Sequence, residues 1–582
     1  MATYVTQHAL VAAIDFGTTY SGYAFSLLED YKKEPWKIHT KIWAGSRSLM
    51  SQKAPTCALF DSNKKFHSFG YDAEDKYADL AEDGEEEEWY YFRRFKMILY
   101  NKMKLENDIA LGTDDGKKQL PAITVFSSCI KYMVDDLFQQ CQDRNTGIEL
   151  TDILWVLTVP AIWNDVAKHF MREAAVKAGI PGNQLLISLE PEAASIYCKS
   201  LPIKVMPESK NGSRPLQPGD KYLILDAGGG TVDITVHKVH DDGTLRELHA
   251  AGGGDWGGTN VDKAFEDLQV KLVGTDVMEK VGRSDKSGKL ELSREFEVKK
   301  RKFNPSKTDH FSMRVPVAIS ETYENESGKT LNEAITGKIA YKGGVRWVKD
   351  KLRIDADIAK GFFSESLKNI GKHLEKMFRC PVIKDVRNIV MVGGYSESSI
   401  LQEFIKKKFA EKKVIIPPEP SLAVLKGAVL FGFNPHVIAE RICKFTYGCG
   451  KSVPFIDGVH PPDKMYITDQ GTKNCVDIFE KIAEIGEPIK TGKPQYETAR
   501  VPADRKQKAI TIRIFASVEE DPKYVTDKSC AYLGTIRVPL VEAEGLDRRV
   551  RLKIYISGTE IEVVAVEENT GKMMLAKLEF LG

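Results

Sequence analysis

The chain has 582 residues, and its 83 lysines and arginines almost balance its 82 aspartates and glutamates, so the formal net charge at pH 7 is +1. At about 150 residues per domain, this length predicts three or four domain-sized units. The balanced charge excludes a global electrostatic field for nucleic acid or for an anionic membrane surface. No apolar run reaches the ~20 residues that cross a bilayer, and no basic segment opens the chain, so we expect neither a transmembrane segment nor a signal peptide.

The nine cysteines are scattered along the chain. They form no Cys-x-x-Cys pair and no Cys/His cluster with metal-ligand spacing, and an odd number argues against a complete disulfide framework. We therefore expect reduced thiols and a cytoplasmic location.

The first structured segment, "VAAIDFGTTYSGYAFS" at 11–26, places two apolar runs around a Gly-Thr-Thr turn and so predicts a β-hairpin. Consecutive backbone N–H groups in such a turn can bind phosphate oxygens, which makes Gly17, Thr18 and Thr19 candidates. Asp15 ends the first strand and would repel a bare phosphate. Its presence favours a hydrated Mg²⁺ between carboxylate and phosphate.

Residues 40–120 are charged and aromatic and are interpreted as an insertion, in which the acidic run at 84–88 is most simply a solvated loop. The segment at 153–180 then places a strand before an amphipathic helix, and the segment at 386–409 repeats this order. The alternation predicts an α/β fold with partly parallel sheets.

A second hairpin is predicted at 222–239, "YLILDAGGGTVDITVHKV", with Asp226 at the strand end and Gly228, Gly229, Gly230 and Thr231 in the turn. One such segment alone is most simply a tight turn. Two copies, each with an aspartate at the strand end, favour two lobes that close on a triphosphate, with Asp226 serving the same ion as Asp15.

From about residue 440 the pattern changes to β-rich segments such as "AITIRIFASVEE" and "YLGTIRVPL", separated by Pro, Gly and charged turns, which predicts a separate β-domain. The sequence "GCGKS" at 448–452 is not a P-loop, because Phe445 stands where the earlier glycine is required.

Six segments, taken in order, resemble the signature segments of the 70-kilodalton heat-shock protein family, in the actin-like ATPase superfamily: "AIDFGTTYSGYAFS", "VLTVPAIWNDVAKH", "LEPEAASIY", "LILDAGGGTVDITV", "GGGDWGGTNVD" and "IVMVGGYSESSILQ". The segments "FRRFKMILY" and "SLAVLKGAVLFGFNP" are similar to its divergent 12A and 12B branch. The resemblance implies a two-lobed α/β actin-like ATPase domain followed by a small C-terminal β-sandwich-like domain. Typical members continue into a helical lid, which we do not expect here because the sequence stops at Gly582, just after the last predicted strand. The implied boundaries are 9–196 for lobe I (insertion about 40–120), 197–435 for lobe II (insertion about 255–350) and 436–582 for a β-rich substrate-binding-like domain.

The same resemblance implies ATP/ADP and Mg²⁺ as ligands and assigns roles to individual residues. The implied phosphate-loop residues are Asp15, Gly17, Thr18, Thr19 and Tyr20 in the first loop and Asp226, Gly228, Gly229, Gly230, Thr231 and Asp233 in the second. The implied catalytic residues are Asp15, Lys96, Glu190, Asp226, Thr231 and Asp233, and Asp15 and Asp226 would hold Mg²⁺ through water. The implied adenosine-binding residues are Glu297, Lys300, Arg301, Gly393, Gly394 and Tyr395.

Several of these assignments leave alternatives open. The Lys-rich segment "EVKKRK" at 297–302 resembles a helix that clamps adenine, or it is a solvated helix face. Asp233 would help to position water, or it is a polar residue that an alternating strand tolerates. Glu190 would orient the attacking water, or it is a polar residue at a helix start. Lys96 would neutralise charge on the γ-phosphate, but Arg93 and Arg94 are also candidates for that cation.

The function that we expect is ATP binding with slow ATP hydrolysis by a chaperone-like, stress-response protein. The nucleotide state would bias a β-domain that captures extended or unfolded polypeptide segments and works with co-chaperones. The segment "HVIAERICKFTYG" at 436–448 replaces the apolar interdomain linker of typical members. A nucleotide-gated adaptor with little ATPase activity is the alternative, and a small-molecule kinase on the same scaffold is disfavoured by the β-domain.

Overall fold

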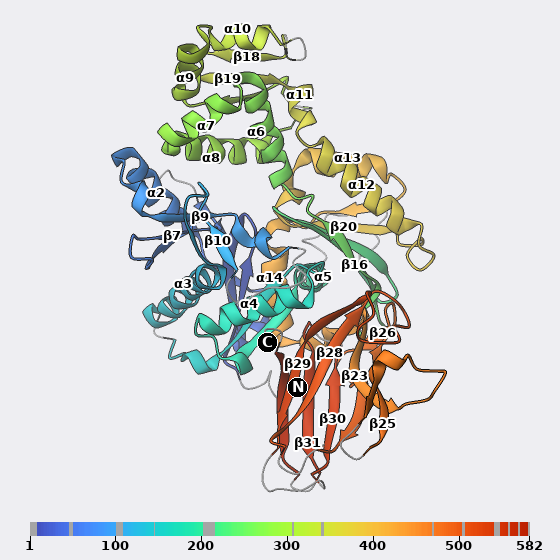
Figure 1. The fold of residues 1–582 in the computed structure, drawn as a ribbon. Coiled ribbons are helices and arrows are strands. Elements are labelled where there is room, and N and C mark those ends of the chain that lie inside the picture. Colours follow the sequence, from blue (N-terminus) through green and yellow to red (C-terminus); the bar gives the residue numbers. More distant parts are fainter. Residues whose placement is uncertain are drawn as a thin grey trace.

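A computed structural model of the chain describes residues 8–45, 50–100, 109–144, 146–201, 216–304, 306, 308–338, 341, 343–467, 471–502, 507–540, 548–556, 559–568 and 571–579. Two α/β lobes lie side by side, and a β-rich C-terminal region lies beneath them (Figure 1). No helix within the described ranges has both the length and the apolar character needed to cross a bilayer.

The sheet of lobe I is built around the first predicted hairpin. β1 pairs in parallel with β12 and antiparallel with β2, and every residue of β1 is buried, as its continuous apolar run predicts. The parallel strands β1 and β12 therefore end at the same edge of the sheet. The strands in order across the sheet are β13 (Leu185–Leu189), β12 (Ile153–Val159), β1 (Leu10–Phe16), β2 (Tyr20–Leu27) and β3 (His39–Thr40), with β6 (Ala54–Pro55) also paired to β2.

Helices cover this sheet, and two of them lie between the lobes. At residue 427 of α14 a Cβ atom would approach the Ala193 carbonyl oxygen of α5 to 1.7 Å, so Gly427 permits the close packing of these helices at the centre of Figure 1. The apolar cluster around them includes side chains from β1, β12, β14 and β20, and it joins the two lobes. The helices of lobe I are α1 (Leu28–Lys33), α3 (Ala122–Asp143), α4 (Asp165–Lys177) and α5 (Glu190–Ser200), and α14 (Ala423–Phe433) returns to it late in the chain.

The insertion of lobe I forms the blue subdomain in Figure 1, where α2 lies beside a three-stranded sheet of order β8-β7-β9. A short 3₁₀ helix at Phe95–Leu99 follows β9 and points back to the main sheet. The elements of the insertion are β4 (Trp43–Ala44), β5 (Met50–Ser51), β7 (Cys57–Phe60), β8 (Phe66–Phe69), α2 (Tyr71–Asp83), β9 (Tyr90–Arg93), β10 (Ala110–Gly112) and β11 (Gln119–Pro121).

The second predicted hairpin forms the centre of the lobe II sheet. β14 pairs antiparallel with β15 and in parallel with β20, which repeats the arrangement around β1. The strands in order are β21 (Lys413–Ile415), β20 (Asn388–Val392), β14 (Lys221–Ala227), β15 (Val232–Val239), β16 (Leu245–Gly254), β22 (Ile438–Ile442) and β26 (Pro488–Lys490). The helices packed on it are α6 (Thr259–Val273), α12 (Ser364–Phe378) and α13 (Ser399–Lys408).

The insertion of lobe II forms the subdomain at the top of Figure 1, in which helices lie against a three-stranded sheet of order β17-β19-β18. The Lys-rich segment "EVKKRK" lies on α8, in agreement with the helix that the family resemblance implies. The elements are α7 (Thr275–Ser284), α8 (Lys286–Lys302), β17 (His310–Arg314), α9 (Val317–Ser327), α10 (Leu331–Thr336), β18 (Val345–Val348), β19 (Lys351–Asp355) and α11 (Ala356–Gly361).

The C-terminal region contains one sheet of order β24-β25-β23-β28-β29-β32-β31-β30-β27. Side chains from β23 and β28 share one apolar cluster with side chains from β30 and β31, so the sheet folds over a common core. Its strands are β23 (Thr446–Pro454), β24 (Met465–Ile467), β25 (Lys473–Ala483), β27 (Tyr496–Arg500), β28 (Ala509–Ser517), β29 (Cys530–Pro539), β30 (Val550–Tyr555), β31 (Glu562–Glu567) and β32 (Met573–Glu579).

Candidate functional site

The turns of the two hairpins meet face to face between the lobes. A Cβ atom on Gly229 would lie 2.2 Å from the Thr19 hydroxyl oxygen, and one on Gly230 would lie 2.5 Å from the Thr18 hydroxyl oxygen. Only glycine fits at these two positions without a shift of the opposite loop. The two predicted phosphate loops are therefore one structural unit.

Carbonyl groups of both loops accept hydrogen bonds from neighbouring segments, which fixes the position of the loops. In the second loop, the carbonyl oxygens of Gly228, Gly229 and Gly230 accept hydrogen bonds from the N–H groups of residues 258, 259 and 257. In the first loop, Thr56 donates its hydroxyl to the Gly17 carbonyl at 2.8 Å, and its N–H to the carbonyl of residue 19. The Gly228 N–H group donates to the Thr231 carbonyl within the turn, so the remaining N–H groups of the loops are the candidates to bind a ligand in the pocket that the loops line.

One pocket collects the predicted site residues from both lobes. All of them line it except Asp233, which lies behind its wall. The predicted residues that line the pocket are Asp15, Gly17, Thr18, Thr19, Tyr20, Lys96, Glu190, Asp226, Gly228, Gly229, Gly230, Thr231, Glu297, Lys300, Arg301, Gly393, Gly394 and Tyr395. The fold thus joins segments that are up to about 380 residues apart in the sequence.

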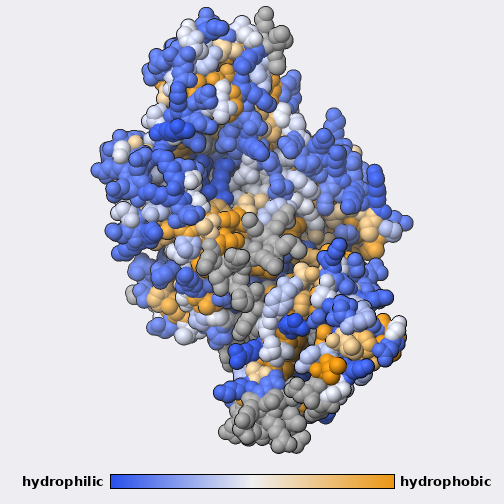
Figure 2. Space-filling view, viewed as in Figure 1, coloured by the Kyte–Doolittle hydropathy of each residue, from blue (hydrophilic) through white to orange (hydrophobic). Residues whose placement is uncertain are grey.

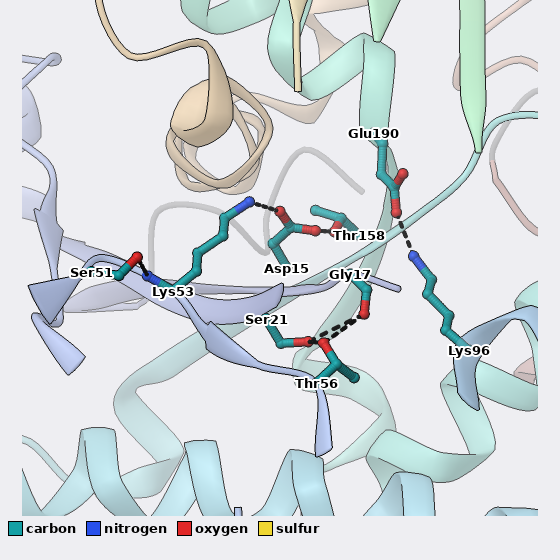
Figure 3. Close-up of polar contacts among 9 residues, drawn as sticks. All are labelled: Asp15, Gly17, Ser21, Ser51, Lys53, Thr56, Lys96, Thr158 and Glu190. Carbon is teal, nitrogen blue, oxygen red and sulfur yellow. Dashed lines mark hydrogen bonds and ion pairs between the residues drawn. The ribbon is translucent and has the colours of Figure 1, made fainter. Parts of the chain in front are cut away.

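Of the three candidate cations Arg93, Arg94 and Lys96, Lys96 is the one that lines the pocket. Its side chain is only 2% exposed, and its ammonium donates to Glu190 Oε1 at 2.7 Å (Figure 3). Arg94 instead forms an ion pair with Asp262 at 2.8 Å, and Arg93 does not line this pocket. Burial raises the pKa of Glu190 to about 7, although the Lys96 charge opposes that rise.

Asp15 has two partners that the sequence does not predict. Lys53 places its ammonium 2.5 Å from Asp15 Oδ2, and the Thr158 hydroxyl donates to Oδ1 at 2.8 Å (Figure 3). Burial would raise the pKa of Asp15, but the Lys53 charge and hydrogen bond outweigh it and hold the pKa below its usual value. Asp15 is therefore an ionised, fully partnered carboxylate.

Asp226 and Asp233, on the second hairpin, have different surroundings. Burial raises the pKa of Asp226 well above its usual value, and the negative charges of nearby carboxylates add to the rise. Burial also raises the pKa of Asp233, although the Ile162 N–H group donates to its carboxylate at 2.9 Å and opposes the shift. Both groups would gain from positive charge brought by a ligand.

The predicted adenosine side is a compact set of charges on α8. Glu297 pairs with Lys300 at 2.5 Å and with Arg301 at 2.7 Å, and the Arg301 guanidinium lies 4.6 Å from the centre of the Tyr20 ring. Burial would raise the pKa of Glu297, but the two cations lower it to about 2. The apparently solvated Lys-rich segment therefore turns one ionised face into the pocket.

Ion pairs also connect the two insertions above the pocket. Arg294 of α8 contacts Glu74 at 2.8 Å and Asp75 at 2.9 Å, both on α2, and Lys286 pairs with Glu86 at 3.0 Å. The visible surface over α2 and α8 is correspondingly hydrophilic (Figure 2). The pocket is thus bounded by contacts that join the lobes.

A second set of polar contacts ties the site to the C-terminal region. Arg441 of β22 forms a buried two-pronged ion pair with Glu192 of α5, at 2.7 and 2.8 Å. Lys444 donates to the Ala161 carbonyl at 2.9 Å, next to the Ile162 N–H group that binds Asp233. No local motif predicts the contacts of Arg441 and Lys444, because their partners lie more than 200 positions away in the sequence.

Sequence reasoning missed Lys53, Thr158, Glu192, Arg441 and Lys444. Thr158 had a usable signal, since it lies near the end of a strand parallel to β1 and parallel strands end at the same edge. Glu192 lies in the same first helical turn as the predicted Glu190. Lys53 had no usable signal in the sequence, because the segment "SQKAPT" has no periodic pattern that would predict a buried lysine.

The residues present fit a nucleoside triphosphate. Two loops with available N–H edges, the Lys96 ammonium and the α8 charges can bind phosphates and a nucleoside. Among the described residues, no group of three or more His, Cys, Asp or Glu side chains is arranged to hold a metal ion directly. A divalent ion would therefore depend on phosphate oxygens and water, as the sequence predicts for Asp15 and Asp226.

Comparisons with known proteins confirm the resemblance seen in the sequence. The family model described as Hsp70 protein matches residues 93–433. Heat shock 70 kDa protein 12A from Mus musculus is 35% identical over 630 residues, and the human protein of that name is 34% identical. Human heat shock 70 kDa protein 12B is 32% identical over 635 residues. Each alignment covers 98% of this chain and 91% of the relative.

These similarities support an Hsp70-like nucleotide-binding protein with a two-lobed actin-like ATPase domain, which agrees with the two hairpin-centred sheets and the pocket between them. The divergent 12A and 12B branch predicted from "FRRFKMILY" and "SLAVLKGAVLFGFNP" is also where these relatives lie. The chain belongs to the Hsp70 protein family.

Proposed function

We propose that this protein binds ATP between its lobes, hydrolyses it slowly and uses the nucleotide state to bias its β-rich C-terminal region. The observation that carries this proposal is the single pocket in which both phosphate loops meet the Lys96–Glu190 pair. A site built only to bind a nucleotide would not require a buried acid and an ammonium beside the phosphate loops.

In the proposed binding mode the triphosphate lies between the N–H edges of the two loops. The nucleoside extends toward Glu297, Lys300 and Arg301 on one side and toward the Gly393–Gly394 turn and Tyr395 on the other. When bound, Mg²⁺ supplies positive charge to the phosphates, and Asp15 and Asp226 are the carboxylates proposed to hold it through water.

In the proposed reaction Glu190 acts on the attacking water. Its carboxylate orients the water and accepts a proton, which suits an acid whose pKa is about 7. Lys96 is bonded to Glu190 and brings positive charge to the γ-phosphate as negative charge develops there. Thr231 completes the wall, and Asp233 lies outside the lining, where the Ile162 N–H group donates to its carboxylate.

The proposed coupling runs through the first turn of α5. Glu190 faces the nucleotide pocket, and Glu192, two residues later, holds Arg441 of the strand that leads into the C-terminal region. A change at Glu190 that rotates this turn would strain the buried pair. Lys444 offers a parallel route to Asp233 through residues 161 and 162.

The C-terminal region is proposed to act as a β-sandwich-like domain for extended or unfolded polypeptide. β24 is an edge strand, and Met465, Tyr466 and Ile467 on it are all exposed, so an extended segment could add to this edge. Co-chaperones, a stress response and a cytoplasmic location belong to the same proposal, and the nine free cysteines agree with that location.

Single-turnover hydrolysis of radiolabelled ATP with Mg²⁺ tests the proposal, with bound ATP and bound ADP measured separately. We expect the intact protein to cleave bound ATP and the Asp226→Asn variant to bind it without cleavage. Asp241→Asn, in an exposed turn after β15, is the matched control and should behave as the intact protein. Failure of the intact protein to bind ATP would contradict the whole proposal.

The adaptor function remains the second candidate because Glu190 is already engaged by Lys96. An acid held in an ion pair orients water less freely than an unpaired one. The same experiment separates the two functions, since bound but uncleaved ATP in the intact protein favours the adaptor.

A further inference from the structure

Lys53 lines the pocket between the lobes, and its backbone and side chain are held there by neighbouring residues. Residue 53 lies between β5 and β6, and β6 pairs with β2 of the first hairpin. A Cβ atom on Gly22 would come within 3.2 Å of the Lys53 Cγ atom, so the glycine leaves space for the lysine stem. The Lys53 N–H group donates to the Ser51 hydroxyl at 3.3 Å, and the side chain is 15% exposed. Its ammonium is thus held, not free in solvent.

This ammonium contacts Asp15, one of the two aspartates that the sequence predicts as the Mg²⁺ carboxylates, and its charge also acts on the other, Asp226. It is 2.5 Å from Asp15 Oδ2, and Thr158 occupies Oδ1, so both Asp15 oxygens have a donor (Figure 3). The positive charge of Lys53 also acts on Asp226, where it opposes the effect of burial on the carboxyl pKa. A divalent ion at Asp15 would therefore meet a resident cation.

We propose that Lys53 is a phosphate-binding residue that takes at Asp15 the place expected for the divalent ion, so that ATP binds with an affinity nearly independent of Mg²⁺. This inference rests on the proposed function, because it concerns the same pocket. It adds a residue that none of the motifs contains, and it revises one part of the binding mode proposed above, because Lys53 and not a hydrated Mg²⁺ then occupies Asp15.

The chemistry of the ammonium group supports this role. Lysine has three N–H donors, and only one is needed for Asp15, which leaves two for phosphate oxygens of the ligand. Lys96 is directed to Glu190, so the two lysines serve different carboxylates of the pocket. Together they neutralise part of the charge that a triphosphate brings into a pocket lined by four acidic side chains, Asp15, Glu190, Asp226 and Glu297.

Titration calorimetry of ATP binding, with Mg²⁺ or with excess EDTA, tests the proposal on the full chain. For the intact protein we expect EDTA to change Kd by less than about threefold. For Lys53→Met in EDTA we expect Kd to rise about tenfold or more, the loss of one charge-assisted hydrogen bond. Added Mg²⁺ should restore much of this loss, because the substitution frees an Asp15 oxygen.

Two further variants and one direct probe control the result. Lys53→Arg keeps the charge and should keep EDTA-insensitive binding, and Lys65→Met, an exposed lysine between β7 and β8, should not differ from the intact protein. Mn²⁺ followed by electron paramagnetic resonance should bind the ATP-loaded Lys53→Met protein more tightly than the intact one. Unchanged thermal unfolding of each variant would show that the substitutions preserve the fold.

The outcomes also separate this inference from the function on which it rests. If ATP binding by the intact protein depends on Mg²⁺ as strongly as ATP binding by Lys53→Met, the proposed role of Lys53 is overturned. The proposed function would then still stand. Equal ATP affinity of both proteins in EDTA would lead to the same conclusion. No ATP binding under any condition would overturn both.

Discussion

The two hairpins share a sequence pattern and a strand arrangement, yet their aspartates differ in charge environment. Asp15 of the first hairpin is ionised between Lys53 and Thr158. Asp226 of the second is buried, has no hydrogen bond or ion pair among the described residues, and has a strongly raised pKa. The comparison shows that a local motif specifies the backbone of a phosphate loop, whereas distant residues decide the charge that the loop presents.

The largest effect is expected from exchanging the two aspartates for asparagine in the nucleotide-free protein. Asp15→Asn removes the partner of the buried Lys53 ammonium and should lower the free energy of unfolding by about 3 kcal/mol. Asp226→Asn removes a costly buried carboxylate and should leave that free energy unchanged or raise it. Urea denaturation at pH 7 measures both, and equal losses would show that the two environments do not differ.

A methyl group at the contact between the hairpins tests whether they act as one unit. Gly229→Ala places a Cβ atom 2.2 Å from the Thr19 hydroxyl oxygen and should weaken ATP binding about 10- to 100-fold, as overpacking forces the loops apart. Gly361→Ala, in lobe II with nothing within 4 Å of the new atom, is the control. Equal affinity of both variants in titration calorimetry would mean that the loops move independently.

The pH dependence of hydrolysis tests whether Glu190, at the start of α5 and outside both hairpins, is the general base. Burial raises the pKa of Glu190 to about 7, so the active carboxylate is depleted below that pH. The single-turnover rate should rise about tenfold per pH unit below pH 7 and then level off. Glu190→Gln should remove this dependence along with most of the activity. A flat profile in the intact protein would argue against Glu190 as the base.

The smallest effect is expected at the link to the C-terminal region. Lys444→Met removes the hydrogen bond to the Ala161 carbonyl, one residue from the N–H group that holds Asp233. We expect the hydrolysis rate to change about two- to tenfold, as for the loss of one hydrogen bond, with ATP affinity unchanged. Lys451→Met, whose ammonium binds Glu480 within the C-terminal sheet, is the control.

Much of the fold was predictable because it depends on local patterns. Both hairpins, the strand–helix units and the β-rich C-terminal region follow from apolar periodicity and turn residues, and the structure contains them. Part of the pocket between the lobes was predictable from those turns, whereas Lys96, Glu190, the α8 residues and Gly393 lie far from them in the sequence and were implied only by the family resemblance. The choice of Lys96 over Arg93 and Arg94 was not, since it depends on the positive φ of Arg94 and the 3₁₀ helix that follows it.

The charge partners were not predictable for a related reason. Lys53 meets Asp15 across 38 positions, and Arg441 meets Glu192 across 249. Nothing in a single sequence marks which of the many lysines and arginines will be buried opposite an acid. The same limit applies to β22, whose pairing with β16 depends on where the preceding helix α14 places the chain.

The sheet of lobe II has a mechanical consequence. Its strands pair in series from β21 through β22 to β26, with register shifts where β16 pairs with β15 and β22, and β26 comes from within the C-terminal region. Sliding one strand past another by a single residue would turn its side chains to the opposite face, so such a sheet resists shear. We therefore expect lobe II and the C-terminal region to move together. A hinge motion between the lobes would therefore act on the interface between lobe I and the C-terminal region. There Arg172 binds Glu560, and the Thr559 hydroxyl donates to the Ile187 carbonyl.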